Sequence, residues 1–111
     1  MLSNVITPME MQSIDAATLG LGAYSTFNDA GIEGALCFIR ITNDSDTDVY
    51  ISYDGVNDHE FIEAGERIEV YFQANSAPTN YVSKLKKYTV IYIRGNAQST
   101  GYIYVAGYYN E

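Results

Sequence analysis

The stretch at residues 48–61, DVYISYDGVNDHEF, joins an alternating run to a turn. Val49, Ile51 and Tyr53 occur at every second position, which is the period of a β-strand with one face toward a core. The Asp-Gly-Val-Asn-Asp that follows is rich in turn-forming residues, and Gly55 is suited to a positive φ angle. The stretch therefore predicts a strand, a turn and the beginning of a return strand.

Four further runs share this period of two. They are LCFIRIT at 36–42, ERIEVYF at 66–72, YTVIYIRG at 88–95 and GYIYVAGYY at 101–109. In the first of them we expect Cys37, Ile39 and Ile41 on the core side and Leu36 on the opposite side. Asn, Asp, Ser and Gly dominate the short connectors between the runs. We therefore predict an all-β fold, a small antiparallel β-sandwich or jelly-roll-like domain.

Two parts of the chain lack this period. Residues 1–34 carry small residues and scattered glycines, and we expect an extended N-terminal arm with one strand near residues 23–27. Such an arm becomes ordered against a neighbouring molecule. Residues 73–87 form a longer connector with room for a short extra strand at 81–83. The chain is therefore divided into an arm, residues 1–34, and a β-sandwich domain, residues 35–111.

The composition restricts the classes of function. Of the 111 residues, 47% are hydrophobic and 18% are charged, as in a globular chain. The net charge is −8 and the only basic cluster is Lys84, Lys86 and Lys87, so we expect neither a nucleic-acid nor a membrane partner. The single cysteine, Cys37, excludes an intrachain disulfide. With no secretory signal and no membrane-spanning apolar run, synthesis in a cytosol is expected.

The only histidine, His59, stands between Asp58 and Glu60 and raises the question of an enzyme. Neighbouring residues of an extended chain point to opposite faces, so these two carboxylates do not orient the imidazole. Ser52 is the conceivable nucleophile, but it lacks a GxSxG-like elbow. One histidine also does not supply a usual zinc set. We therefore predict no enzyme activity, no catalytic residue and no cofactor, and a turn or strand-start role for His59.

The acidic run Asp44, Asp46 and Asp48 resembles the beginning of a calcium loop. An EF-hand needs glycine at the sixth position and glutamate at the twelfth, where this chain has Val49 and Gly55. Clustered carboxylates also suit calcium in other geometries. We expect a solvated turn here, and no metal site.

Tyrosine supplies 11 of the aromatic residues, against 4 phenylalanines and no tryptophan. If the aliphatic residues of the runs face the core, many of the tyrosines share the opposite faces. Several exposed rings on adjacent strands usually mark a protein contact, and the alternatives are ordinary packing and the stacking of sugars. The candidate interaction surface comprises Tyr50, Tyr71, Tyr88, Tyr92, Tyr102, Tyr104 and Tyr108.

The order of strands and turns resembles that of small virion proteins of tailed bacteriophages. In that pattern one strand ends in asparagine, and the next strand ends in Ser-x-Asp-Gly before an Asp-His-like segment. An Ala-Gly pair then precedes a third strand, and glycines flank the last turn. The matching positions here are Asn43, Ser52, Asp54, Gly55, Asp58, His59, Ala64, Gly65, Gly95 and Gly101. SIDAATLGLGAYSTF at 13–27 is similar to the arm of such proteins, whereas VSKLKKYT at 82–89 departs from the expected Pro/Gly turn.

The resemblance implies a non-enzymatic structural component of a bacteriophage particle with a β-sandwich core. Its place would be that of a capsid decoration protein or of a neck or tail adaptor, made in the host bacterial cytoplasm. The implied partners are other copies of the chain, as a homo-oligomer, and capsid, portal or tail proteins of the virion. The alternative is a carbohydrate-binding host-attachment module that stacks sugars on Tyr102, Tyr104 and Tyr108. A small hydrolase around His59 is the third reading.

Overall fold

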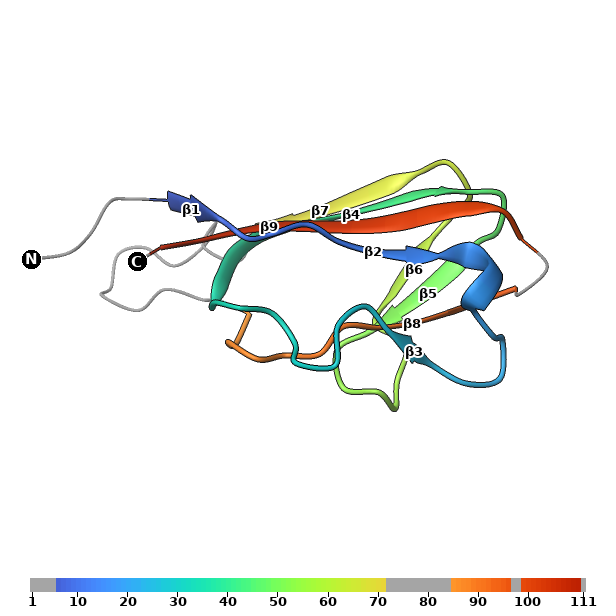
Figure 1. Cartoon of the computed structure of the whole chain (residues 1–111), viewed down its shortest axis with the longest axis horizontal. Coiled ribbons are helices and arrows are strands. Elements are labelled where there is room, and N and C mark those ends of the chain that lie inside the picture. The colour runs from blue at the N-terminus through green and yellow to red at the C-terminus, as the bar shows by residue number, and fades with distance from the viewer. Residues whose placement is uncertain (1–5, 72–84, 97–98, 111) are drawn as a thin grey trace, which may run out of the picture.

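The chain folds into two antiparallel β-sheets packed face to face, which confirms the predicted all-β sandwich (Figure 1). The structure is a computed structural model that describes residues 6–71, 85–96 and 99–110. Its elements are β1 (Ile6–Pro8), β2 (Gln12–Asp15), the 3-10 helix η1 (Ala16–Thr18), β3 (Ser25–Thr26), β4 (Leu36–Ser45), β5 (Val49–Ser52), β6 (Glu60–Ile62), β7 (Arg67–Tyr71), β8 (Tyr92–Gly95) and β9 (Gly101–Asn110).

Each sheet takes strands from both halves of the chain. The first sheet has the order β1-β9-β4-β7, with β2 also paired to β9, and the second has the order β3-β8-β5-β6. The chain therefore passes between the sheets at most connections, and only β5 and β6 follow each other within the second sheet. This strand order is that of a jelly roll. The ten-residue strands β4 and β9 pair along their length and form the middle of the first sheet.

The apolar residues of the alternating runs fill the space between the sheets. The first sheet contributes Ile39, Ile41, Ile103 and Val105, and all four side chains are fully buried. From the second sheet come Val49, Ile51 and Ile93, which are equally buried. Full burial of such a side chain contributes about 1.5–3 kcal/mol relative to exposure. The predicted inward faces of these runs are confirmed.

The predicted alternation is wrong at the beginning of β4. Leu36 is fully buried in the core, although we expected it on the opposite side. The register of β4 against β9 shifts between Leu36 and Phe38, and such an irregularity reverses the side to which the preceding residues point. Cys37 is 8% exposed, and its thiol donates to the carbonyl oxygen of Tyr108 over 3.3 Å.

Much of the N-terminal segment is built into both sheets. β1 and β2 pair with β9, and β3 pairs with β8. Met9, Ala16, Leu19 and Ile32 belong to the hydrophobic core. The described part of this segment is therefore ordered by its own chain, and the expectation that it needs a neighbouring molecule is wrong there. Of the three strands in this segment only β3 was predicted, near residues 23–27. The predicted boundary between arm and sandwich, at residues 34 and 35, lies in the connector before β4.

The strand predicted at residues 88–95 is shorter in the structure. β8 begins at Tyr92, because the chain turns at residues 87–88, where Tyr88 adopts a positive φ of 70°. Its N–H donates to the carbonyl oxygen of Ile32 over 3.0 Å, outside any strand. The strand predicted at 81–83 lies outside the described residues. Over the described ranges, no helix has the length and apolar character needed to cross a membrane.

Candidate functional site

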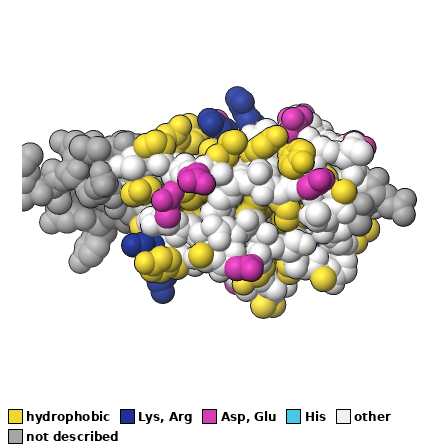
Figure 2. Space-filling model, in the orientation of Figure 1, with side chains coloured by type: hydrophobic (Ala, Val, Ile, Leu, Met, Phe, Trp, Pro, Cys, Tyr) yellow, Lys and Arg dark blue, Asp and Glu magenta, His cyan; other side chains and the backbone are white. Residues whose placement is uncertain are grey.

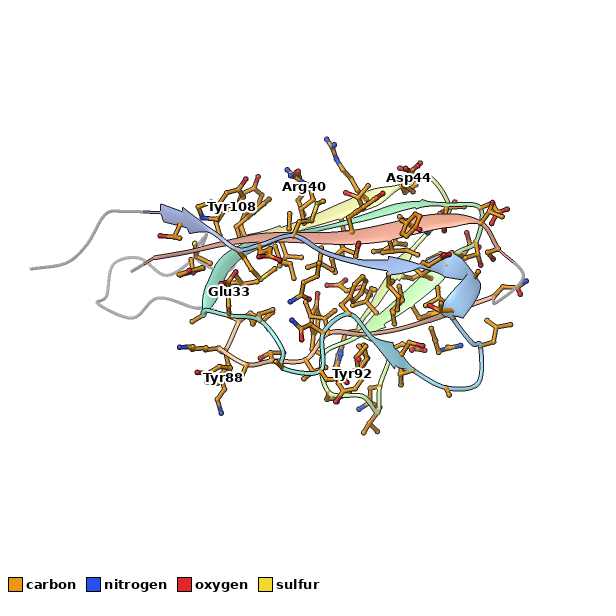
Figure 3. All side chains as sticks on the ribbon, in the orientation of Figure 1. Glu33, Arg40, Asp44, Tyr88, Tyr92 and Tyr108 are labelled. Atoms are coloured by element: carbon orange, nitrogen blue, oxygen red, sulfur yellow. The ribbon has the colours of Figure 1, made fainter. Side chains whose placement is uncertain are left out.

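The tyrosines of the candidate surface do not share one face. Figure 3 shows Tyr108 above the first sheet, on the opposite side of the molecule from Tyr92 and Tyr88. Alternation with buried neighbours places Tyr71, Tyr102, Tyr104 and Tyr108 on the outer face of the first sheet. By the same criterion Tyr50 and Tyr92 lie on the outer face of the second sheet, and Tyr88 lies in the connector before β8. The most exposed are Tyr88, Tyr71 and Tyr102, at 66%, 63% and 46%.

An aromatic row crosses the outer face of the first sheet, formed by Tyr71, Phe38 and Tyr108. Phe38 stands opposite Tyr71 on β7 and opposite Tyr108 on β9. The ring centroids are 4.6 Å apart in the first pair and 5.7 Å in the second. Such pairs contribute about 0.5–1.5 kcal/mol beyond their buried area. Phe38 was absent from the predicted surface, although its outward position in LCFIRIT could have identified it.

A hollow interrupts the outward column of β9, where the residues are Tyr102, Tyr104, Ala106 and Tyr108. Ala106 leaves space between the larger rings on either side of it. The resulting hollow has a volume of about 190 Å³ and is lined by Met11, Arg40, Thr42, Tyr104 and Ala106. Met11 is 58% exposed. We refer to this feature as the Ala106 hollow.

Charged side chains of both signs stand beside the hollow. Arg40 lies opposite Glu69 in the register of β4 and β7, and an Nη1 to Oε2 distance of 3.9 Å joins them. Each side chain is 36% exposed, and an exposed pair of this kind adds little stability. Figure 2 shows basic side chains standing among the hydrophobic ones along the upper edge of the molecule. The face thus combines aromatic, apolar and paired charged groups.

The outer face of the second sheet is held together by its own contacts. Arg94 donates to both carboxylate oxygens of Asp58, over 3.0 and 2.6 Å, and Tyr24 donates its hydroxyl to the same carboxylate over 2.6 Å. These two donors lower the pKa of Asp58 to about 2. The guanidinium of Arg94 also lies 4.1 Å from the ring centroid of Tyr50, which packs against Phe61. Much of the hydrogen-bonding and aromatic capacity of this face is therefore already used.

His59 takes part in the turn between β5 and β6. Its N–H donates to the carbonyl oxygen of Ile51 over 2.7 Å, and its Nδ1 accepts from the N–H of Tyr53 over 3.0 Å. Its Nε2 lies 3.8 Å from Asp54, and its ring stacks on that of Tyr53. The predicted turn or strand-start role is confirmed.

Ser52 and Asp54 complete the same turn. The buried Ser52 hydroxyl donates to Asp54 over 3.0 Å and accepts from the N–H of Gly55 over 2.9 Å. The backbone N–H groups of Asn57 and Val56 hold the pKa of the Asp54 carboxyl well below its usual range. Gly55 has the expected positive φ, 77°. Each of these polar groups has a structural partner in the turn.

Two carboxylates of the acidic run, those of Asp46 and Asp48, accept hydrogen bonds from the backbone of other loops. Asp46 accepts from the backbone N–H of Thr100 over 2.9 Å, and Asp48 accepts from that of Ala64 over 3.0 Å. Between them these carboxylates connect the turn after β4 to two other connectors. Among the residues that the structure describes, no three His, Cys, Asp or Glu side chains are grouped so that they could hold a metal ion.

Comparison with known proteins gives a similarity in structure but none in sequence. No protein-family model matches the chain, and no curated protein matches it. Its fold is similar to that of the Dit protein (gp 19.1) of phage SPP1, described as a paradigm of the hub adsorption apparatus in phages that infect Gram-positive bacteria. The TM-score is 0.43 and the identity 9%, over 96% of this chain and 49% of the Dit chain. The chain thus spans about half the length of the Dit protein, and a similarity of this degree transfers no function.

Proposed function

We propose that this chain is a non-enzymatic structural component of a tailed-bacteriophage particle, a capsid decoration protein or a neck or tail adaptor. The observation that carries the proposal is the aromatic row of Tyr71, Phe38 and Tyr108 on the outer face of the first sheet. The resemblance of the strand and turn order to small virion proteins supports the phage context.

The aromatic row suits a contact between proteins. Aromatic rings supply large apolar area while losing little side-chain entropy, and tyrosine adds a hydroxyl for hydrogen bonding. The row lies on the middle and edge strands of a sheet, whose long β4–β9 pairing holds it rigidly. Preorganised groups of this kind lose little freedom on binding. The non-enzymatic role is supported by the turn that contains Ser52, Asp54 and His59, because these side chains accept hydrogen bonds from backbone N–H groups.

The proposal is tested by composition analysis of purified virus particles. We expect the chain in particles of the virus that encodes it, in a fixed ratio to the major capsid or tail protein. Tyr71→Ala should reduce the incorporation of the chain into particles at least tenfold, because it removes an exposed ring of the aromatic row on the edge strand β7. The hydrophobic core is not changed by this substitution. Phe61→Ala on the other sheet, where the side chain is 48% exposed, is the matched control and should be incorporated normally. Absence of the chain from purified particles would refute the proposal.

A carbohydrate-binding attachment module is the second candidate function. The Ala106 hollow favours it, because an aromatic residue, Tyr104, and two polar residues, Thr42 and Arg40, line one space of about 190 Å³. Sugars stack on aromatic faces and exchange hydrogen bonds with such polar groups. Binding to an array of bacterial surface glycans, lost in Tyr104→Ala, would establish this function. Silence on the array together with unchanged adsorption of Tyr104→Ala particles would eliminate it.

A further inference from the structure

The outer face of the first sheet carries a protruding residue next to a hollow. Three residues, Met9 to Met11, lie between the pairs Pro8–Tyr108 and Gln12–Val105, where β9 has only Ala106 and Gly107. The strand β1–β2 therefore holds one extra residue at this point, and such a bulge redirects the chain. Met9 enters the core, whereas Met11 is 58% exposed at the rim of the Ala106 hollow.

A protrusion and a hollow on one patch are what a self-complementary contact requires. In a two-fold dimer each copy presents the same patch, so that a group from one copy meets its complement on the other in both directions. Met11 is an unbranched and adaptable side chain, well suited to fill an irregular apolar space. The hollow, about 190 Å³ in volume, has the apolar wall of Tyr104 and Ala106 to receive it.

The charges of this face also favour contact between two copies. Its outward positions carry two basic residues, Arg40 and Arg67, and three acidic residues, Asp15, Asp44 and Glu69, so the charges of this face sum to −1. The whole chain has a net charge of −8, and two copies therefore repel each other over most of their surfaces. A face with a charge close to zero is where this repulsion is small. A two-fold contact can additionally set Arg40 of each copy against Glu69 of the other.

We propose that the outer face of the first sheet pairs with the same face of a second copy, with Met11 of each copy in the Ala106 hollow of the other. This deepens the proposed function, on which it rests, by naming a second copy as the partner of the aromatic face. Strands about 4.8 Å apart and residues about 3.3 Å apart give the face a size on the order of 20 Å by 20 Å. Such a face offers about 400 Å² per copy and about 800 Å² for the pair, which is below the roughly 1,200 Å² of a stable interface, so the dimer is expected to be weak and to dissociate on dilution.

Analytical ultracentrifugation of the full chain over a wide range of concentration tests the contact. The wild-type chain should pass from monomer to dimer as its concentration rises. Ala106→Trp, which fills the hollow, and Met11→Ser, which removes the protrusion, should each weaken dimerisation at least tenfold. Phe61→Ser is the matched control on the other sheet and should dimerise like the wild type. The thermal midpoint at dilutions where all chains are monomeric checks that each variant is folded.

A charge exchange gives a second, independent test. Arg40→Glu and Glu69→Arg should each weaken the dimer, and the double variant should restore it. A wild-type chain that is monomeric at all concentrations, a ring or trimer, or a dimer unaffected by Ala106→Trp would overturn the two-fold contact. A monomeric chain still found in purified particles would overturn this contact while the proposed function stands. A dimer that is absent from particles would confirm the contact and refute that function.

Discussion

The backbone of Gly31 lies directly against that of Tyr88. A β-carbon added at Gly31 would come within 2.3 Å of the Tyr88 carbonyl oxygen. Both residues have positive φ angles, 80° and 70°, which only glycine adopts without strain. This contact joins the connector before β4 to the connector before β8, and thus couples the two sheets.

We expect Gly31→Ala to destabilise the fold by about 3 kcal/mol, since the new methyl adds a backbone clash to the cost of the positive φ. Gly65→Ala is the matched control, because Gly65 has a φ of 82° and open space around its added β-carbon. It should cost only about 1 kcal/mol. Urea unfolding of the two variants measures the difference, and equal losses would show that the Gly31–Tyr88 contact is unimportant.

The packing of the N-terminal segment is tested at two leucines. Leu19 is 2% exposed and belongs to the core, whereas Leu21 is 57% exposed. Leu19→Ala should lower the free energy of unfolding by about 2–5 kcal/mol, as for other buried leucines. Leu21→Ala should change it by about 0.5 kcal/mol at most. Two equally small effects in thermal or urea unfolding would mean that the segment is a detachable arm.

Asn43 is the polar centre of the turns next to β4 and is fully buried. Its side-chain nitrogen lies 2.7 Å from the carbonyl oxygen of Thr47, 3.1 Å from that of Ile62 and 3.2 Å from that of Glu63. Asn43→Ala removes this donor from all three carbonyl groups, of which that of Thr47 keeps the Ser45 hydroxyl, and we expect a loss of about 2–4 kcal/mol in the free energy of unfolding.

The neighbouring residue provides the control for this variant. Asp44 is exposed, and Asp44→Ala should change the stability by about 0.5 kcal/mol or less. If Asn43→Ala were as stable as Asp44→Ala in urea, the hydrogen bonds of Asn43 would not hold these turns together.

Acid should weaken the Arg94–Asp58 pair. The pKa of Asp58 is about 2 in the folded chain, against an ordinary value of 3.8, so its contribution is fully present above the ordinary value. That contribution is lost as the pH falls from about 4 to about 2, because the unfolded chain then binds more protons. Urea unfolding at a series of pH values should show this decline.

Two variants isolate the contribution of Asp58 to the acid response. Asp58→Asn removes the titrating group, and Arg94→Gln removes its principal hydrogen-bond donor. Both should flatten the dependence of stability on pH in the acid range. The pKa of Asp54 is also lowered in the folded chain, so part of the decline in stability should remain in each variant. A wild-type slope in Asp58→Asn would show that the pair does not contribute.

The strands of the alternating runs could be predicted because their signal is local, whereas β1 and β2 were missed. In a β-strand successive side chains point to opposite faces, so the period of Val49 and Ile51, or of Ile103 and Val105, follows from the backbone geometry alone. The turn at Gly55 could be predicted for the same reason, because the preference of certain residues for turns depends only on a few neighbouring positions. The buried faces, the sandwich class and the structural role of His59 could therefore be derived before any tertiary contact was known.

The functional surface depends on contacts between distant parts of the chain. Which sheet a strand joins decides that Tyr50 and Tyr104 lie on opposite sides of the molecule, and no local pattern carries that information. The shift at Leu36 and the extra residue that exposes Met11 arise where one strand is matched against another. Pairing energy is shared between segments that are tens of residues apart, so register is a property of the assembled sheet. The alternation of buried and exposed residues was thus determined by the sequence. The aromatic row and the Ala106 hollow form only when β4, β7 and the N-terminal strands are assembled with β9 in one sheet.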